Sequence, residues 1–398
     1  MEWKEVRLGD VCTRVCSGGT PKSTNLSYYG GEIPWLNTKE IDFNRIYSTE
    51  KTITDSGLNN SSAKWIVPNT VTVAMYGATA GKSCIVKVPM TTNQACCNLT
   101  INDEVADYEF VYYTLKNDYT TLASLANGGA QQNLNAQIIK DYVLKMPSLA
   151  DQRRIASILS SLDRKIELNN KINADLEEMA QAIFKNWFVD FEPFKDSKFV
   201  DSELGMIPEG WKVGTLKDLL YLRKDSIKAA NKGNLPYLPI DTIPMHCLVA
   251  TDFKSNDEAK SSLQTFEQND IVVGAMRVYF HRVILAPCKG ITRTTCFVLS
   301  VKNENALAYS LMQCNQDEAI SFAEKTSKGS TMPYAVWDGG YGEYKVVIPP
   351  SEVMKSFNDL LSNFFSKMNK NTIENSRLSL LRDTLLPRLM SGEIEVPE

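Results

Sequence analysis

The chain has 398 residues, of which 43% are hydrophobic and 23% are charged, and its formal net charge at pH 7 is −4. This composition is typical of a globular protein large enough for at least two domains, and it excludes a uniformly basic nucleic-acid binder. No apolar run reaches the roughly 18 residues of a transmembrane helix, and the charged N-terminal stretch does not resemble a signal sequence. We therefore expect a cytoplasmic protein without a membrane partner.

The cysteines and histidines suggest no catalytic or metal chemistry of their own. Nine cysteines have the spacing of neither a disulfide framework nor a zinc site, so reduced thiols are expected. The two histidines, His246 and His281, lie in no recognisable nucleophile or metal-binding motif. We expect no metal and no histidine-based catalysis in this chain.

Acidic residues are unevenly distributed along the chain. There is none between Asp55 and Asp103, and none between Asp270 and Glu304, although both stretches carry lysine or arginine. The pattern predicts two local positive surfaces within an acidic protein.

In the first half of the chain, apolar runs predict strands and an amphipathic stretch predicts a helix. The strands are expected at 70–75, 83–88 and 95–101, the helix at 107–118, a polar glycine-rich loop at 127–135 and a last strand at 142–147.

The stretch "GATAGKS" at 77–83 resembles a phosphate-binding loop. A Walker A loop is one residue longer between its first glycine and its Gly-Lys-Ser, and it opens a helix, whereas this stretch lies between two predicted strands. A nucleotide hydrolase that uses this loop is therefore only an alternative hypothesis. A second enzyme alternative is a stand-alone methyltransferase. Its only support is "NLPY" at 234–237, which lacks the first proline of the Asn-Pro-Pro-Tyr motif of amino-methyltransferases.

The second half of the chain repeats the order of the first. "EWKEVRLGDV" at 2–11 returns as "GWKVGTLKDL" at 210–219, and "VTVAMYG" at 71–77 returns as "VVGAMRV" at 272–278. The counterpart of the 77–83 loop lacks both glycines and the Gly-Lys-Ser, so this loop is a variable element on a repeated scaffold. Strands are then expected at 281–286, 296–302 and 344–349, a helix at 304–314 and a polar loop at 328–340.

A long segment with heptad spacing closes each half, and the two segments align without a gap. The seam is the row of heptad positions along which two paired helices meet. An asparagine at a seam position costs stability unless its amide meets a partner on the other helix. Asn169 and Asn173 can meet Asn371 and Asn375 in an antiparallel pair, so the pattern favours such a pair over ordinary core helices. The expected seam holds Ile155, Leu159, Leu162, Ile166, Asn169, Asn173, Leu176, Ala180 and Ile183 in the first helix, and Phe357, Leu361, Phe364, Met368, Asn371, Asn375, Leu378, Arg382 and Leu385 in the second.

The sequence thus predicts an α+β fold with a pseudo-two-fold internal repeat, in which two similar mixed α/β domains are separated by a long antiparallel two-helix coiled-coil rod. Two domains held apart by a rigid rod suit the recognition of two sites on one duplex, where half-sites recur about 34 Å apart per turn. The expected segments are the first domain at 1–147, the first rod helix at 148–192, a linker at 193–210, the second domain at 211–349, the second rod helix at 350–390 and a tail at 391–398.

Four stretches resemble the specificity subunit of type I restriction–modification systems: "SGGTPKSTNLSYYGGEIPWLNTKEI", "MYGATAGKS", "MPSLADQRRIASILSSLDRKIELNN" and "LRDTLLPRLMSGEIEV". The resemblance implies that each globular domain is a target-recognition domain for one half of a bipartite DNA sequence. It also implies that the rod is a spacer and docking platform, and that this chain is not an enzyme. The second rod helix departs from the pattern, with "SEVMKSF" where the first has "ADQRRIA".

The partners implied by the resemblance are double-stranded DNA, a pair of modification subunits that methylate adenine, and ATP-driven restriction subunits. S-adenosylmethionine, ATP and magnesium are expected in those partner subunits, and no cofactor is expected in this chain. A coiled-coil scaffold with no role in nucleic-acid binding is a third hypothesis.

Loops rich in amide, hydroxyl and basic side chains are the expected places of DNA contact, although any single member also fits a solvated turn. Amides suit adenine and arginine suits guanine. The repeated aromatics Trp3, Trp211, Trp35 and Tyr237 are expected in the core rather than in base stacking. The candidates are Thr20, Lys22, Lys39, Tyr76, Lys82, Asn93, Gln94, Gln131, Gln132 and Asn133 in the first domain, and Arg277, Tyr279, Arg282, Arg293, Thr294, Ser330 and Tyr334 in the second.

Overall fold

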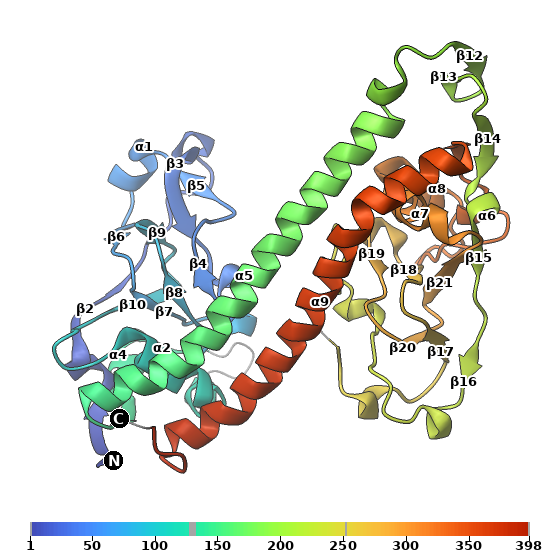
Figure 1. The fold of residues 1–398 in the computed structure, drawn as a ribbon. Coiled ribbons are helices and arrows are strands. Elements are labelled where there is room, and N and C mark those ends of the chain that lie inside the picture. Colours follow the sequence, from blue (N-terminus) through green and yellow to red (C-terminus); the bar gives the residue numbers. More distant parts are fainter. Residues whose placement is uncertain (1, 127–132, 251–252, 397–398) are drawn as a thin grey trace. The chain divides into compact units, whose positions relative to one another are not determined.

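The computed structural model describes residues 2–126, 133–250 and 253–396 (Figure 1). The chain divides into two compact units. The first unit comprises Met1–Asp163 and Leu380–Glu398, and the second comprises Arg164–Ser379. Each of the two long helices of the chain therefore contributes residues to both units.

The first globular domain consists of strands β1 to β11 and helices α1 to α4. A five-stranded sheet has the order β2-β10-β7-β8-β4, a four-stranded sheet has the order β5-β3-β9-β6, and β1 pairs with β11. The elements are β1 (Lys4–Arg7), β2 (Cys12–Ser17), β3 (Tyr29–Leu36), β4 (Arg45–Ile46), β5 (Thr52–Ile53), α1 (Asp55–Asn59), β6 (Trp65–Ile66), β7 (Val71–Ala74), β8 (Ser83–Val86), β9 (Met90–Thr92), β10 (Cys96–Ile101), α2 (Tyr108–Asn117), α3 (Tyr119–Ser124), α4 (Ala136–Asp141) and β11 (Val143–Met146).

The second globular domain repeats this plan. Its main sheet has the order β15-β21-β18-β19, a smaller sheet has the order β16-β17-β20, and β14 pairs with β22. The elements are β14 (Lys212–Thr215), α6 (Leu216–Leu219), β15 (Leu220–Leu222), β16 (Ser226–Ile227), β17 (Leu263–Phe266), β18 (Ile271–Gly274), β19 (Val283–Leu285), β20 (Gly290–Arg293), β21 (Cys296–Val301), α7 (Leu307–Cys314), α8 (Asp317–Lys325) and β22 (Lys345–Ile348).

The strand registers define how the two domains align. Val71 of β7 lies opposite Leu99 of β10, and Ile271 of β18 lies opposite Leu299 of β21, so equivalent residues here are 200 apart. The similarity of "VTVAMYG" to "VVGAMRV" had placed the equivalent residue one position later. The hydrogen-bond register corrects that alignment, because a shift by one residue would turn every side chain of a strand to the opposite face.

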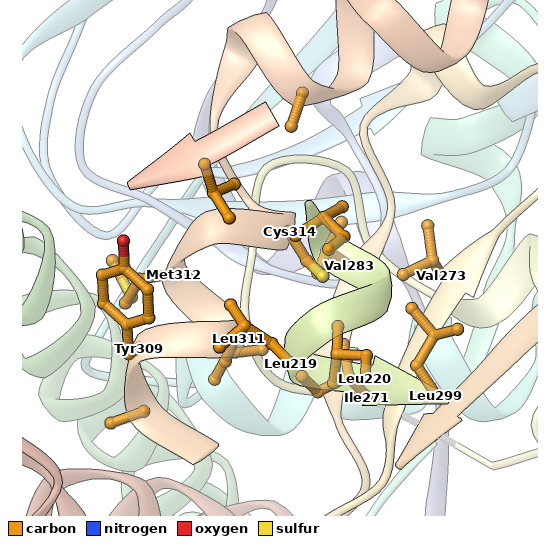
Figure 2. Close-up of a cluster of buried hydrophobic side chains, with 14 of the residues drawn as sticks. Leu219, Leu220, Ile271, Val273, Val283, Leu299, Tyr309, Leu311, Met312 and Cys314 are labelled. Carbon is orange, nitrogen blue, oxygen red and sulfur yellow. The ribbon is translucent and has the colours of Figure 1, made fainter. Parts of the chain in front are cut away.

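The core of the second domain is formed where α7 packs on its main sheet. Figure 2 shows Leu311 and Cys314 of α7 with Val283 and Leu299 of the sheet in one buried cluster. Burial removes this apolar surface from water and stabilises the fold by roughly 25 cal/mol per Å². The predicted α+β class and internal repeat are confirmed.

The segment predicted as a linker, 193–210, contains a β-hairpin made of β12 (Phe199–Ser202) and β13 (Gly205–Pro208). Gly205 has φ 94°, a left-handed conformation that glycine adopts without a steric penalty, and it lets the chain reverse tightly at this point. The prolines and glycines that mark a linker in the sequence are therefore also turn residues of a hairpin.

Two helices of 40 residues, α5 (Leu149–Phe188) and α9 (Ser351–Met390), are each about 60 Å long at 1.5 Å per residue. They are the long green and red helices of Figure 1. Positions 202 residues apart have equivalent environments. Ile155, Leu159, Leu386 and Met390 lie in the core of the first unit, and their equivalents Phe357, Leu361, Phe184 and Phe188 lie in the core of the second.

The predicted seam positions differ in burial. Phe365 is buried and the predicted Phe364 only partly, because a helix with 3.6 residues per turn drifts away from a strict heptad pattern. The buried seam residues are Ile155, Leu159, Asn169, Asn173, Ala180, Phe357, Leu361, Met368, Asn371 and Asn375, and the half-buried ones are Leu162, Ile166, Leu176, Ile183, Phe364, Leu378, Arg382 and Leu385.

Candidate nucleic-acid interface

The loop that resembles a phosphate-binding motif joins β7 to β8, and its counterpart joins β18 to β19. Gly77 and Gly81 have φ 78° and 85°, and Arg277 and His281, 200 residues later, have φ 50° and 49°. The same left-handed backbone positions thus recur in both loops. Glycine fits them without strain, so the glycines of "GATAGKS" are explained by backbone geometry. The loop leads into a strand and not into the long helix that a phosphate loop opens.

In the first domain, the structure brings two pairs of candidates together. Tyr76 forms an isolated β-bridge with Asn133, and the Thr20 hydroxyl donates to the side-chain carbonyl of Gln94. Gln131 and Gln132 lie outside the described residues. The exposed candidates of this domain are Thr20, Lys22, Lys39, Tyr76, Gln94 and Asn133.

Two candidates of the first domain are engaged within it. Asn93 is buried; its Oδ1 accepts from the Ala95 N–H at 3.0 Å, and its Nδ2 donates to Asn37 Oδ1 at 3.3 Å. Its amide therefore fixes the turn between β9 and β10. Lys82 is half-buried, and its Nζ lies 2.6 Å from Asp42 Oδ1, so an acid from outside the acid-free stretch neutralises this lysine.

In the second domain, the loop after β18 meets the 328–335 segment. The Arg277 N–H donates to the Pro333 carbonyl at 2.8 Å, and Met276 forms a bridge with Tyr334. A cavity of about 500 Å³ is lined by Thr294 and Tyr334 among others. The exposed candidates of this domain are Arg277, Tyr279, Arg293, Thr294, Ser330 and Tyr334.

Arg282 has an internal role. It is half-buried, and its Nη1 donates to the carbonyl of Ile243 at 2.7 Å and to that of Ile240. A guanidinium that satisfies two backbone carbonyls holds a loop in place and is not free to reach a base. The sequence could not distinguish this arginine from its neighbours, because both roles require the same side chain.

The predicted positive surface of the second domain is reduced by one ion pair. Lys289 pairs with Glu267 at 2.7 Å, although Glu267 lies outside the acid-free stretch. Within the described part of the chain, neither Arg277 nor Arg293 has an acidic partner. Lys328, which is not among the predicted contacts, forms a bridge with Tyr334 and lines the same 500 Å³ cavity. Its position in the predicted polar loop at 328–340 was the feature of the sequence that could have marked it as a contact.

The seam asparagines form hydrogen bonds between α5 and α9 inside the second unit. Asn371 Nδ2 donates to Asn173 Oδ1 at 2.8 Å, and Asn169 Nδ2 donates to Asn375 Oδ1 at 2.9 Å. All four side chains are buried. Because each amide meets its partner in only one register, these pairs fix the antiparallel alignment of the two helices here.

A buried polar network joins α5, α9, α2 and β4 inside the first unit. Asp163 accepts from Tyr113 Oη at 2.6 Å and from Arg382 Nη1 at 2.7 Å, and Arg45 lies 3.7 Å away. Burial and the charge of Asp163 raise the pKa of Tyr113 above its ordinary value. For Arg382, burial disfavours the charge, but hydrogen bonds to Asp383 and Asp163 outweigh it, and the pKa is raised.

Comparison with known proteins adds a likeness to one family. Residues 1–178 match the model of the type I restriction modification DNA specificity domain. The specificity subunit of the type I restriction enzyme MjaIX from Methanocaldococcus jannaschii is 29% identical over 100% of this chain and 94% of that protein. Over its whole length the chain is thus similar to a specificity subunit of a type I restriction enzyme. The HindI specificity subunit of Haemophilus influenzae is 23% identical, over 72% of this chain and 77% of the relative.

The fold of this chain also occurs in a solved structure. The crystal structure of a type I S subunit from M. genitalium matches with a TM-score of 0.60 and 17% identity, over 100% of this chain and 97% of that one. Among the described residues, no helix is long and apolar enough to span a membrane.

Proposed function

We propose that this chain is the specificity subunit of a type I restriction–modification system and that it reads a bipartite site on double-stranded DNA, with one half-site for each globular domain. The observation that supports this most is the equivalence of the β7–β8 and β18–β19 loops. They share left-handed backbone positions at 77 and 277 and at 81 and 281, yet they present different side chains. One scaffold that carries two sets of loop residues suits the recognition of two different sequences.

The exposed candidates supply the proposed contacts. Arg277 and Arg293 would pair with guanine edges or phosphates, and Gln94 and Asn133 would pair with adenine. Lys328 joins this set because it lies beside Tyr334. The remaining proposed contacts are Thr20, Lys22, Lys39 and Tyr76 in the first domain and Tyr279, Thr294, Ser330 and Tyr334 in the second.

In this proposal, residues 1–147 and 211–349 are target-recognition domains, and α5 and α9 are the spacer and the docking platform for a pair of modification subunits. Restriction subunits complete the nuclease. S-adenosylmethionine, ATP and magnesium would be bound by those partner subunits in the cytoplasm. The asparagine pairs support the spacer role, because a fixed helix register gives a fixed separation.

A direct test compares two single charge removals in the complex with its modification subunits. Arg293→Gln is expected to weaken binding to the cognate duplex at least about fivefold, since a bidentate base contact is worth about 1–3 kcal/mol. Lys325→Gln, which removes an equal charge from the end of α8, is expected to change binding less than twofold. Equal effects of the two variants would contradict a base-reading role for Arg293.

The enzyme alternative is tested with the purified chain alone. Turnover of ATP, or methyl transfer to DNA in the absence of partner subunits, would overturn the proposal. The strand that follows the 77–83 loop gives the hydrolase hypothesis no structural support.

A further inference from the structure

The two histidines of the chain lie together in the second unit, although they are 35 positions apart in the sequence. Their ring centroids are 4.5 Å apart, and the His246 N–H donates to the His281 carbonyl at 2.8 Å. Asp317, at the start of α8, completes the group. One ligand atom of each of the three residues lies within 4.8 Å of the others.

The buried ring of His281 is oriented by its surroundings. Its Nε2 lies 3.1 Å from the backbone carbonyl of Asn315, which can only accept a hydrogen bond, so Nε2 carries a proton. Its Nδ1 lies 3.1 Å from Asp317 Oδ1. A neutral ring would therefore point a lone pair at a carboxylate oxygen, and a positive species between the two atoms is needed to make this contact favourable. That species is either a proton or a metal ion.

We propose that His246, His281 and Asp317 bind one divalent transition-metal ion of the zinc class. Imidazole nitrogen and carboxylate oxygen bond to zinc at about 2.0–2.2 Å, which places neighbouring ligands of a tetrahedral site about 3.3 Å apart. The observed 3.1 Å between His281 Nδ1 and Asp317 Oδ1 is close to this separation. His246 and Asp317 are exposed, so rotation of their side chains would bring them onto the ion.

The hydrogen bond from His281 to Asn315 is typical of a metal site. Metal-binding histidines usually donate their second ring N–H to a carbonyl or carboxylate, which fixes the tautomer and the orientation of the ring. Three protein ligands would leave the fourth position of the ion open. The site lies at the wall of a cavity of about 730 Å³ that is also lined by Gln181 of α5.

The backbone at His281 gives independent support. His281 and His246 both have positive φ, 49° and 50°, a conformation that side chains with a Cβ adopt at an energetic cost. The first domain has Gly81 at the position equivalent to His281, where the same conformation is free of this cost. A histidine held in a strained conformation, where glycine would serve the fold, indicates that the imidazole itself has a role.

The sequence predicted no metal in this chain. The proposed site was not visible there, because its three ligands come from a loop, the end of the β18–β19 connection and the start of a helix. Cys247 is not expected to take part. Its thiol is not in the group of three ligand atoms that lie within 4.8 Å of one another, and it donates to the Val249 carbonyl.

The test uses the tag-free full chain, stripped of metal with a chelator and titrated with Co²⁺. We expect one equivalent of Co²⁺ to produce visible d–d absorption, and Zn²⁺ to displace it. His281→Gly keeps the backbone conformation available and is expected to abolish this absorption. Asp317→Asn is expected to weaken Co²⁺ binding at least tenfold. Glu318→Gln, one residue further and outside the group, is the matched control and is expected to bind normally.

Three results would overturn the proposal: no stoichiometric Co²⁺ binding, an unchanged titration in the His281→Gly variant, or an ultraviolet thiolate-to-cobalt band that places the ion on cysteines. Thermal unfolding gives a second readout. Zn²⁺ is expected to raise the melting temperature of the wild type and of Glu318→Gln, and to leave that of His281→Gly unchanged. A zinc-dependent rise in His281→Gly would equally count against the site.

Discussion

Arg382 Nη1 of α9 donates to Asp163 Oδ1 of α5 at 2.7 Å, and the two side chains are only 16% and 8% exposed. The positions 202 residues away from this pair hold Ala180 and Phe365, which both belong to the apolar core of the second unit. The same pair of helix positions is therefore occupied by a buried ion pair in one unit and by an apolar pair in the other. The repeat conserves the packing geometry and not the chemistry of the contact.

Removal of one partner of the ion pair should destabilise the first unit. Arg382→Ala leaves the buried Asp163 with the Tyr113 hydroxyl and a more distant Arg45, and we expect it to lower the free energy of unfolding by roughly 3 kcal/mol. The double variant Asp163→Phe/Arg382→Ala copies the second unit and should recover part of this loss, because Arg45 keeps Glu109 at 3.3 Å and the Tyr113 hydroxyl at 3.2 Å as partners. Urea denaturation measures both. A double variant no more stable than the single one would contradict the equivalence.

At the asparagine seam we also expect a single variant to lose more stability than the double variant, here because the single variant leaves a buried amide without its partner. Asn371→Leu leaves the buried Asn173 without its donor and should cost about 1–3 kcal/mol. Asn173→Leu/Asn371→Leu removes both polar groups and should be near the wild type in stability, although it gives up the contact that fixes the register. Lys370→Leu, at an exposed position of the same helix, should change stability by less than about 0.5 kcal/mol. A double variant that loses as much as Asn371→Leu would argue against this role of the pair.

The raised pKa of Glu177 predicts that the stability of the chain depends on pH. Burial raises the pKa of Glu177 above its ordinary value of 4.5, and the hydrogen bond from the Leu248 N–H offsets this only in part. Because the folded-state pKa is raised, the stability contributed by protonated Glu177 is present below pH 4.5 and is lost as the pH rises through the folded-state value. Glu177→Gln should therefore be more stable than the wild type at pH 7, and the difference should disappear toward pH 4.

Chemical denaturation at the two pH values measures this effect. The neighbouring Glu178→Gln is the control, because Glu178 is exposed and its replacement should change little at either pH. An equal gain for Glu177→Gln at both pH values would show that the raised pKa of Glu177 is not the cause.

Replacement of Arg277 is expected to have opposite effects on the stability of the chain and on its binding to DNA. Its φ of 50° is a left-handed conformation that costs a side chain roughly 1–2 kcal/mol relative to glycine, so Arg277→Gly should stabilise the chain by about 1 kcal/mol while it weakens DNA binding. Gly77→Ala, at the equivalent position, should destabilise by a similar amount. Unfolding and DNA-binding measurements on the same two proteins check both halves. An Arg277→Gly variant that binds DNA as the wild type does would remove Arg277 from the interface.

The sequence predicted the features that depend on periodicity. The heptad spacing and the asparagines at equivalent positions indicated the paired helices, because a buried amide requires a partner at a fixed place. The letters "AMYG" and "AMRV" suggested an alignment that the strand registers shift by one residue. Side-chain similarity could not find the true equivalence of Gly77 and Arg277, because the two share a backbone conformation and no chemistry.

The sequence could not show which candidate residues are free to contact DNA, and the reason is physical. Asn93 and Arg282 have the residue types that read bases, but tertiary packing gives their polar groups internal partners, and the sequence does not contain that information. The contact of His246 with His281 was hidden for the same reason, since their separation in the chain matches no local metal motif.

The central claim, that each domain reads one half of a bipartite site, is tested most directly by mapping adenine methylation in cells. Residues 1–146 are replaced by the corresponding segment of another specificity subunit, and both proteins are produced with their modification subunits. We expect two methylated bipartite sequences that share the half read by residues 211–349 and differ in the other half. A change in both halves, or in neither, would contradict it.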